Sequence, residues 1–147
     1  MIDYDLLMSF LNKWKSILKL ADWDIKLDVV TTEWRKTGDI KIDETDKTAI
    51  LLINICNPKQ TNIEAVIIHE LLHLKLWGMD QMIENLLHCV YGKDSNPQLE
   101  FAYAQFMELL EVTVQDLTKG YVGLGADDKS ISYGRIQKLA DEEWHTK

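Results

Sequence analysis

Residues 65–78 read AVIIHELLHLKLWG, a strongly apolar stretch that carries three polar side chains, His69, Glu70 and His73. Leaving a buried polar group without a partner costs on the order of a few kcal/mol, so each of the three is expected to have one. The apolar residues follow one another too continuously for a half-exposed strand, and the stretch is long enough for a helix. It therefore predicts a buried helix whose polar residues are held by a partner.

Helical spacing places His69 and His73 one turn apart on the same side of this helix. Two imidazoles so placed can direct ring nitrogens at one point, which suits Zn²⁺. Glu70 lies about 100° further round the helix, where its carboxylate can take a proton from a water molecule at the metal. The spacing HExxH therefore predicts a zinc site with Glu70 as general base. The alternative is a buried helix with two hydrogen-bonded histidines and a salt-bridged glutamate.

A catalytic zinc normally has three protein ligands and one open position, so a third ligand must come from elsewhere. The pattern HExxHxxGxxH does not fit, because Leu76 and Met79 stand where glycine and histidine are required. The candidates that follow along the chain are His88, Glu100, Glu108 and Glu111.

Helical geometry ranks these candidates. Over 98–118, Glu111 lies on the flank of the apolar face, whereas Glu108 points nearly opposite, toward solvent. Glu100 shares the flank of Glu111 but lies near the helix start, where acidic residues are common for electrostatic reasons. Glu111 is therefore the expected third ligand, and Glu108 and His88 remain alternatives.

The rest of the chain predicts an α+β fold in one domain, residues 1–147. We expect helices over 3–20, 61–77, 79–92, 98–118 and 133–144, and strands over 23–30, 38–43 and 49–55. Thr61 and Glu64 form a capping box for the second helix, Gly78 is its expected end, and Gly120 ends the long fourth helix. The three strands follow one another with short connections, which indicates a small, mostly antiparallel sheet covered by helices on one face.

Composition limits the class of partner and the compartment. The net charge of −8 argues against nucleic-acid binding, which depends on clustered Lys and Arg. The start of the chain lacks the pattern of a secretory signal, and the longest apolar runs are too short to span a bilayer. Cys56 and Cys89 lie in apolar surroundings without CxxC spacing, which favours reduced core residues over a disulfide. We therefore expect a cytoplasmic protein that does not bind membranes.

His69, Glu70, His73 and a glutamate on a following helix resemble the gluzincin pattern of zinc metallopeptidases. The small size is similar to the minimal-domain, minigluzincin type, and the resemblance covers roughly residues 20–120. It implies a zincin-like fold, a zinc ion held by His69, His73 and Glu111, and a peptide or protein substrate. Gluzincins often carry an acidic residue four positions after the ligand glutamate; here Gln115 has that place, and Asp116 is one step off.

The resemblance also implies how the substrate binds. In gluzincins the strand before the active-site helix borders the cleft, and an extended peptide pairs with it. Residues 49–55, AILLINI, would be that strand, and an ordinary central strand is the alternative. Tyr103 and Tyr121 are candidate donors to the oxyanion of the reaction, or else packing aromatics.

The leading hypothesis is a zinc-dependent peptidase in which Glu70 activates water. The second is a non-catalytic zinc-binding or protein-interaction module of the same fold, with the fourth zinc position closed by His88 or a cysteine. A third is a metal-free interaction domain. The C-terminal extension, 121–147, is a candidate for covering the cleft.

Overall fold

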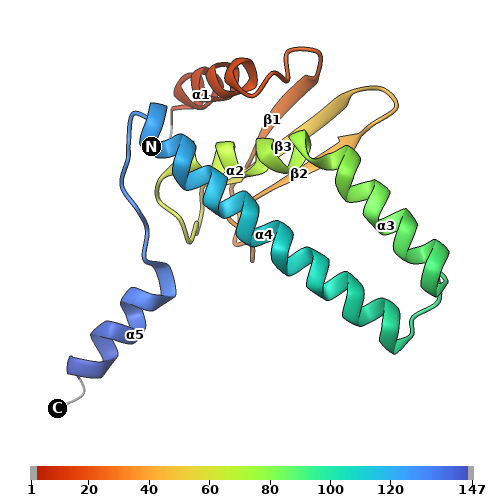
Figure 1. The fold of residues 1–147 in the computed structure, drawn as a ribbon. Coiled ribbons are helices and arrows are strands. Elements are labelled where there is room, and N and C mark those ends of the chain that lie inside the picture. The colour runs from red at the N-terminus through yellow and green to blue at the C-terminus, as the bar shows by residue number, and fades with distance from the viewer. Residues whose placement is uncertain (1–2, 146–147) are drawn as a thin grey trace.

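The computed structural model describes residues 3–145, which form five helices and a three-stranded sheet, an α+β arrangement (Figure 1). The helices are α1 (Tyr4–Ile17), α2 (Ile63–Lys75), α3 (Trp77–Tyr91), α4 (Pro97–Gly125) and α5 (Gly134–His145). The strands are β1 (Asp24–Val30), β2 (Gly38–Asp43) and β3 (Thr48–Asn54). The predicted strands agree with these bounds to within a residue, and the larger differences lie at helix ends.

The sheet is mixed, and its strand order is β1-β3-β2. β2 and β3 form an antiparallel pair, but β1 pairs with β3 in parallel and does not touch β2. The expectation of a mostly antiparallel sheet is therefore wrong for β1. β3 is the most apolar strand and takes the centre, where both of its edges are paired, while residues 31–37 carry the chain past it to the far edge. The expectation that 49–55 borders the cleft is also wrong, since β2 is the edge strand on that side.

One face of the sheet is covered. Along β3, Ala49, Leu51 and Ile53 are buried, whereas Ile50 between them is exposed. This alternation has the period of a strand that packs helices on one side only. α2 lies against β2 and β3 and also contacts α1 and α4.

These neighbours explain why α2 is apolar nearly all the way round. Ile67, Ile68 and Leu71 are completely buried, although they point in different directions from the helix axis.

The ends of α2 differ from the prediction. Asn62 caps the N-terminus by accepting a hydrogen bond from the backbone of Ala65, in place of Thr61.

The predicted capping role of Glu64 is wrong as well, because its carboxylate is buried against α1. At the other end α2 stops at Lys75, and Gly78 lies inside the first turn of α3 instead of ending the helix. α3 ends at Tyr91 with Gly92 as its cap, as expected.

α4 is longer than predicted. It begins as expected, with Pro97 in its first turn and Asn96 as its cap, but it continues through Gly120 to Gly125. The buried side chain of Val122 and the contact of Tyr121 with Trp14 extend it, so packing outweighs the low helix propensity of glycine. Despite this length, no helix within residues 3–145 is both long and apolar enough to cross a membrane.

α5 forms where a terminal helix was predicted, but it points away from the rest of the molecule (Figure 1). None of its residues is buried, and none lines the pocket described below. No residue of 121–145 lines the pocket, and the cover that was considered for 121–147 stays a prediction.

Cys56 and Cys89 are free thiols, which agrees with the expectation of reduced cysteines. Both are exposed, however, so their predicted place in the core is wrong. Cys56 follows β3 in a bend, and Cys89 lies on α3, a helix without any buried residue. Apolar neighbours in the sequence were not sufficient to bury them.

Candidate metal centre

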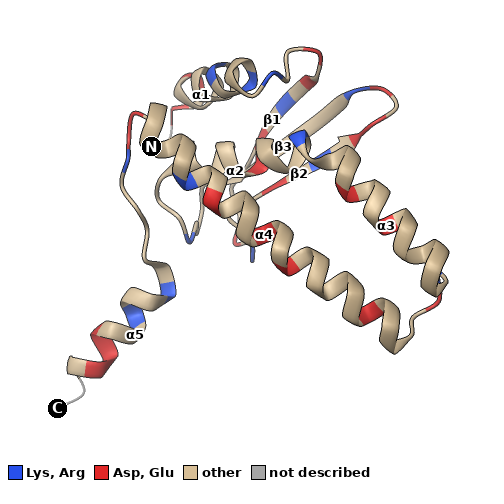
Figure 2. Ribbon diagram, in the orientation of Figure 1, with Lys and Arg blue, Asp and Glu red and all other residues tan. Residues whose placement is uncertain are grey.

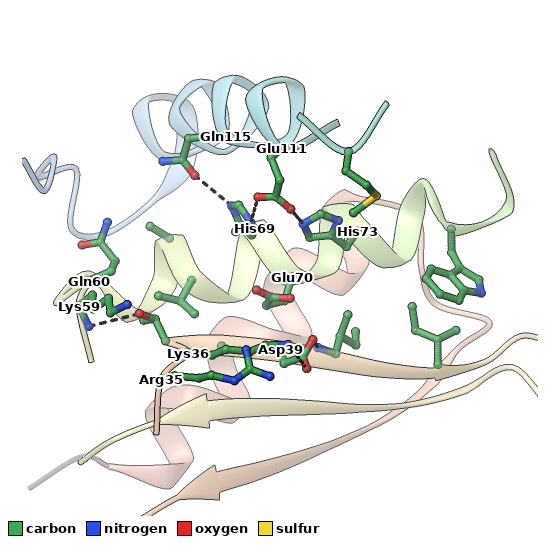
Figure 3. Close-up of a pocket in the computed structure, with 18 of the residues that line it drawn as sticks. Arg35, Lys36, Asp39, Lys59, Gln60, His69, Glu70, His73, Glu111 and Gln115 are labelled. Carbon is green, nitrogen blue, oxygen red and sulfur yellow. Dashed lines mark hydrogen bonds and ion pairs between the residues drawn. The ribbon is translucent and has the colours of Figure 1, made fainter. Parts of the chain in front are cut away.

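Facing residues of α2 and α4 form a cluster of metal-ligating groups. One ligand atom each of His69, His73 and Glu111 lies within 4.8 Å of the other two. The Nε2 atom of His73 is 2.9 Å from Glu111 Oε1, and Nε2 of His69 is 3.5 Å from Oε2. Figure 3 shows both imidazoles turned toward Glu111. The three residues chosen from helical spacing are thus brought together.

The spacing fits a small tetrahedral cation. Two donor atoms that are each about 2.1 Å from a common Zn²⁺ lie about 3.4 Å apart in tetrahedral geometry. The two distances from Glu111 to the histidines lie on either side of this value. Two imidazole nitrogens and one carboxylate oxygen are also a donor set that zinc accepts in catalytic sites.

Gln115, one helical turn after Glu111, orients His69. Its Oε1 is 3.0 Å from His69 Nδ1, so this ring nitrogen carries the proton and donates it to the amide oxygen. The Nε2 lone pair is then free for a cation, which is the usual arrangement around a metal-binding histidine.

The cluster is electrostatically coupled in the absence of metal. Hydrogen bonds from His69 and His73 hold the pKa of Glu111 far below its usual range. Burial lowers the pKa of His69, but the hydrogen bond to Glu111 and the charge of Glu70 outweigh it and raise this pKa above 6.5. The carboxylate of Glu111 therefore stays ionised beside the two imidazoles.

Glu70 lies on the same helix but faces the sheet, between α2 and β2 (Figure 3). It is 9% exposed, and among residues 3–145 no group donates a hydrogen bond to its carboxylate. Burial raises the pKa of Glu70, against the lowering effect of His69 and His73. The carboxylate is therefore more easily protonated than that of an exposed glutamate.

Gly38 lets the edge strand approach Glu70 closely. A Cβ atom at this position would lie 2.7 Å from Cγ1 of Val66 and 3.3 Å from Cγ of Glu70. The first distance is too short for a real contact, so a larger residue would push β2 away from α2. The absence of a side chain at Gly38 thus helps to set the width of the space beside Glu70.

These groups line a pocket of about 660 Å³ between α2, α4 and β2. His69, Glu70, His73, Glu111 and Gln115 all contribute to its wall. The pocket gives the metal cluster an accessible side and places the buried carboxylate beside it. A cation held by the three ligands could therefore meet both water and a ligand that enters the pocket.

The remaining candidates lie elsewhere. His88 and Glu108 are not part of the His69–His73–Glu111 group, and Glu100 is exposed in the first turn of α4. Neither Tyr103 nor Tyr121 lines the pocket, and Tyr121 packs edge-on against Trp14. No fourth His, Cys, Asp or Glu within the described part of the chain joins the group.

Sequence reasoning named Gln115 only as a departure from a pattern and did not identify the basic residues at one end of the pocket. The position four residues after Glu111 was a usable signal for Gln115, because it lies on the same helix face. For Arg35, Lys36 and Lys59 no such signal existed, since they come from two loops that only the fold brings together.

No protein-family model, curated protein or solved structure matches this chain.

Proposed function

We propose that this protein is a zinc-dependent peptidase of the zincin-like, gluzincin type. One observation carries the proposal: His69, His73 and Glu111 converge on one point of a pocket whose wall also holds the carboxylate of Glu70, which accepts no hydrogen bond within residues 3–145. Glu70 is 9% exposed, and no fully buried side-chain oxygen in that range lacks a partner, so its carboxylate oxygens face the open space of the pocket. A purely structural histidine pair would not require such a carboxylate beside it.

His69 and His73 would hold zinc through Nε2, and Glu111 through its carboxylate, with Gln115 fixing the ring of His69. Bound zinc supplies a Lewis acid that acidifies water and polarises a carbonyl oxygen. Glu70 takes a proton from the water that attacks the scissile carbonyl and returns it to the leaving nitrogen as the C–N bond breaks. No covalent link between protein and substrate is needed.

β2 is suited to hold the substrate in an extended conformation. It is hydrogen-bonded to β3 along one edge only, and Gly38, Asp39, Ile40 and Ile42 contribute to the pocket wall. An edge strand offers backbone N–H and C=O groups that a peptide can pair with. The pairing strand proposed here is thus β2 in place of residues 49–55.

Metal analysis of matched variants tests the ligand set. We expect about one zinc ion per chain in the wild-type protein and a large loss of zinc affinity in Glu111→Ala. The loss should exceed the roughly 10–100-fold that removing an outer hydrogen-bond partner costs. Glu108→Ala is the control, because it removes an exposed carboxylate three residues away on the same helix. Elemental analysis and a zinc titration give both quantities.

Equal zinc binding by the Glu111→Ala and wild-type proteins would exclude Glu111 as a ligand. A wild-type protein that binds no stoichiometric zinc, even when zinc is supplied in excess, would end the proposal.

Zinc occupancy should also decrease as the pH decreases. Protons compete for the same Nε2 atoms, and in the metal-free protein the pKa of His69 is raised above 6.5. At constant total zinc, occupancy is therefore expected to decrease between about pH 7 and about pH 5, with protons released on binding. Competition with a chromophoric chelator at several pH values measures this. Unchanged occupancy down to about pH 5 would show that histidines do not hold the ion.

A further inference from the structure

One end of the pocket is basic, although the chain as a whole is acidic. Arg35 and Lys36, from the loop before β2, and Lys59, from the loop before α2, line the pocket together; we call these three residues the cationic end. Asp80 of α3 and Glu111 of α4 are the charged residues of the opposite wall, and both helices carry mostly acidic residues (Figure 2). A pocket with separated charge directs a charged ligand to one end.

The backbone of the cationic end is fixed by hydrogen bonds to a buried side chain. Asn54, at the end of β3, is 1% exposed, and its Nδ2 donates to the carbonyl oxygens of Trp34 and Lys36. The backbone N–H of Lys59 donates to Thr37 Oγ1, which joins the two loops. The basic residues thus stand on an ordered support, which reduces the entropy lost when a ligand binds.

Two of the three cations are free to bind an anion. Lys36 is paired with Asp39 at 2.9 Å, and Asp39 also contacts Lys41. In contrast, the guanidinium of Arg35 and the ammonium of Lys59 have no hydrogen-bond or ion-pair partner within residues 3–145. In Figure 3 Arg35 lies beside β2, and Lys59 lies next to Gln60 near the start of α2. An arginine in such a position can bind a carboxylate through two parallel hydrogen bonds.

The other end of the pocket differs in character. Ile42, Trp77 and Met107 line it, together with Asp80. A carboxylate placed there would lose hydration to apolar side chains and meet a like charge. The cationic end therefore attracts a carboxylate of the ligand and the other end repels it, so the two ends together favour one orientation of an acidic ligand.

We infer that Arg35 and Lys59 bind a carboxylate of the substrate, so that the preferred peptides are acidic on the side of the scissile bond that faces the cationic end. The carboxylate belongs either to an acidic side chain or to a free C-terminus. This inference rests on the proposed function for its substrate class, but the anion site itself is tested by binding alone.

The test measures the dissociation constants of alanine–leucine octapeptides, with blocked ends unless stated, for the 147-residue Glu70→Gln chain supplied with zinc. One pair carries a single glutamate, on the N-terminal or the C-terminal side of the centre. A neutral peptide carries glutamine in those places, and a fourth peptide has the neutral sequence but a free C-terminal carboxylate, which gives it one negative charge. We expect at least one acidic peptide to bind about fivefold or more tightly than the neutral peptide at low salt, since each exposed ion pair contributes a factor of a few.

The preference should disappear when Arg35→Gln and Lys59→Gln are added together, and it should persist in Lys26→Gln. Lys26 is an exposed lysine on β1 that does not line the pocket, so its replacement controls for net charge. A preference due to the cationic end should also weaken between about 0.01 M and about 1 M salt, as the Debye length falls from about 30 Å to about 3 Å. Whether the glutamate peptide or the free terminus is preferred identifies the source of the carboxylate.

Equal binding of all four peptides overturns the inference, and so does a preference that survives in the Arg35→Gln/Lys59→Gln protein. Hydrolysis of the same peptides by the wild-type chain is measured separately. Absence of cleavage together with selective binding would reject the peptidase and leave the carboxylate site standing.

Discussion

Replacing Glu70 with glutamine is expected to abolish hydrolysis and leave zinc in place. The amide has nearly the shape of the carboxylate but cannot take a proton from water. A positioned general base typically contributes a factor on the order of 10²–10⁴, so kcat should fall by about that amount. KM should change little, because the lost interaction acts in the transition state. Steady-state kinetics on a cleaved peptide, with zinc content determined on the same sample, measures both.

The Glu70→Gln chain should also fold normally. Burial raises the pKa of Glu70, which shows that its charged form is disfavoured in the metal-free protein. A neutral side chain of the same size removes this cost, so the thermal midpoint without metal should be equal or higher. Glu108→Gln, at an exposed position, is the matched control and should leave kcat unchanged. Hydrolysis at the wild-type rate by the Glu70→Gln protein would rule out Glu70 as the base.

The activity of the zinc-loaded wild-type protein separates the proposed peptidase from a non-catalytic zinc module. In such a module the metal would stabilise the fold or bind a partner, and the fourth position would be closed by a protein group. His88 and the cysteines, which were candidates for that role, are not part of the metal-capable group. A zinc-loaded wild-type protein that cleaves no peptide would favour the module over the enzyme.

Local patterns predicted the elements of this fold, but not how they are arranged. The alternation in β1 and β2 and the periodicity of α1 depend on neighbours along the chain, and they were located to within a few residues. Strand order depends on which strand gains most free energy from burial at the centre of the sheet. All three strands must be compared to decide this, so the pattern of one strand cannot predict the order. The extent of α4 was underestimated for a similar reason, since the contact of Tyr121 with Trp14 joins residues far apart in sequence.

In the candidate site and around it, local patterns likewise predicted some residues and missed the roles of others. His69, His73 and Glu111 were found because two helices with clear periodicity direct particular faces at each other. Asn62 was passed over as a cap in favour of Thr61, because the capping box required a glutamate three residues later. That glutamate, Glu64, has a different role that no local pattern reveals.

Glu64 is expected to be among the most important polar residues for stability. Its side chain is 1% exposed and accepts hydrogen bonds from Trp14 Nε1 at 2.7 Å, Lys13 Nζ at 2.9 Å and the backbone N–H of Asp127 at 2.8 Å. It thereby joins α1, α2 and the segment after α4. Glu64→Ala leaves the buried indole N–H of Trp14 and the backbone N–H of Asp127 without their acceptor, which should cost about 3 kcal/mol. Lys13 loses one partner but still contacts the carbonyl oxygen of Gly125. In a chain of this size the thermal midpoint should fall by about 6–12 °C.

The effect should depend on pH in a direction that the charge of Glu64 determines. Burial raises the pKa of Glu64, but the hydrogen bonds from Trp14 and Lys13 outweigh it, so the folded-state pKa lies below 4.5. A carboxyl with a depressed pKa stabilises the fold above its unfolded pKa, and this stability is lost as the pH falls through the folded value. The difference in unfolding free energy between the wild-type and Glu64→Gln proteins should therefore shrink below about pH 4.5.

Glu100→Ala, which removes an exposed glutamate from the first turn of α4, is the control for the helix dipole and should cost less than about 1 kcal/mol. Denaturant unfolding at several pH values measures the unfolding free energies of the wild-type protein and of the three variants. If Glu64→Ala and Glu100→Ala lose the same stability, the buried contacts of Glu64 contribute nothing beyond a negative charge at a helix start.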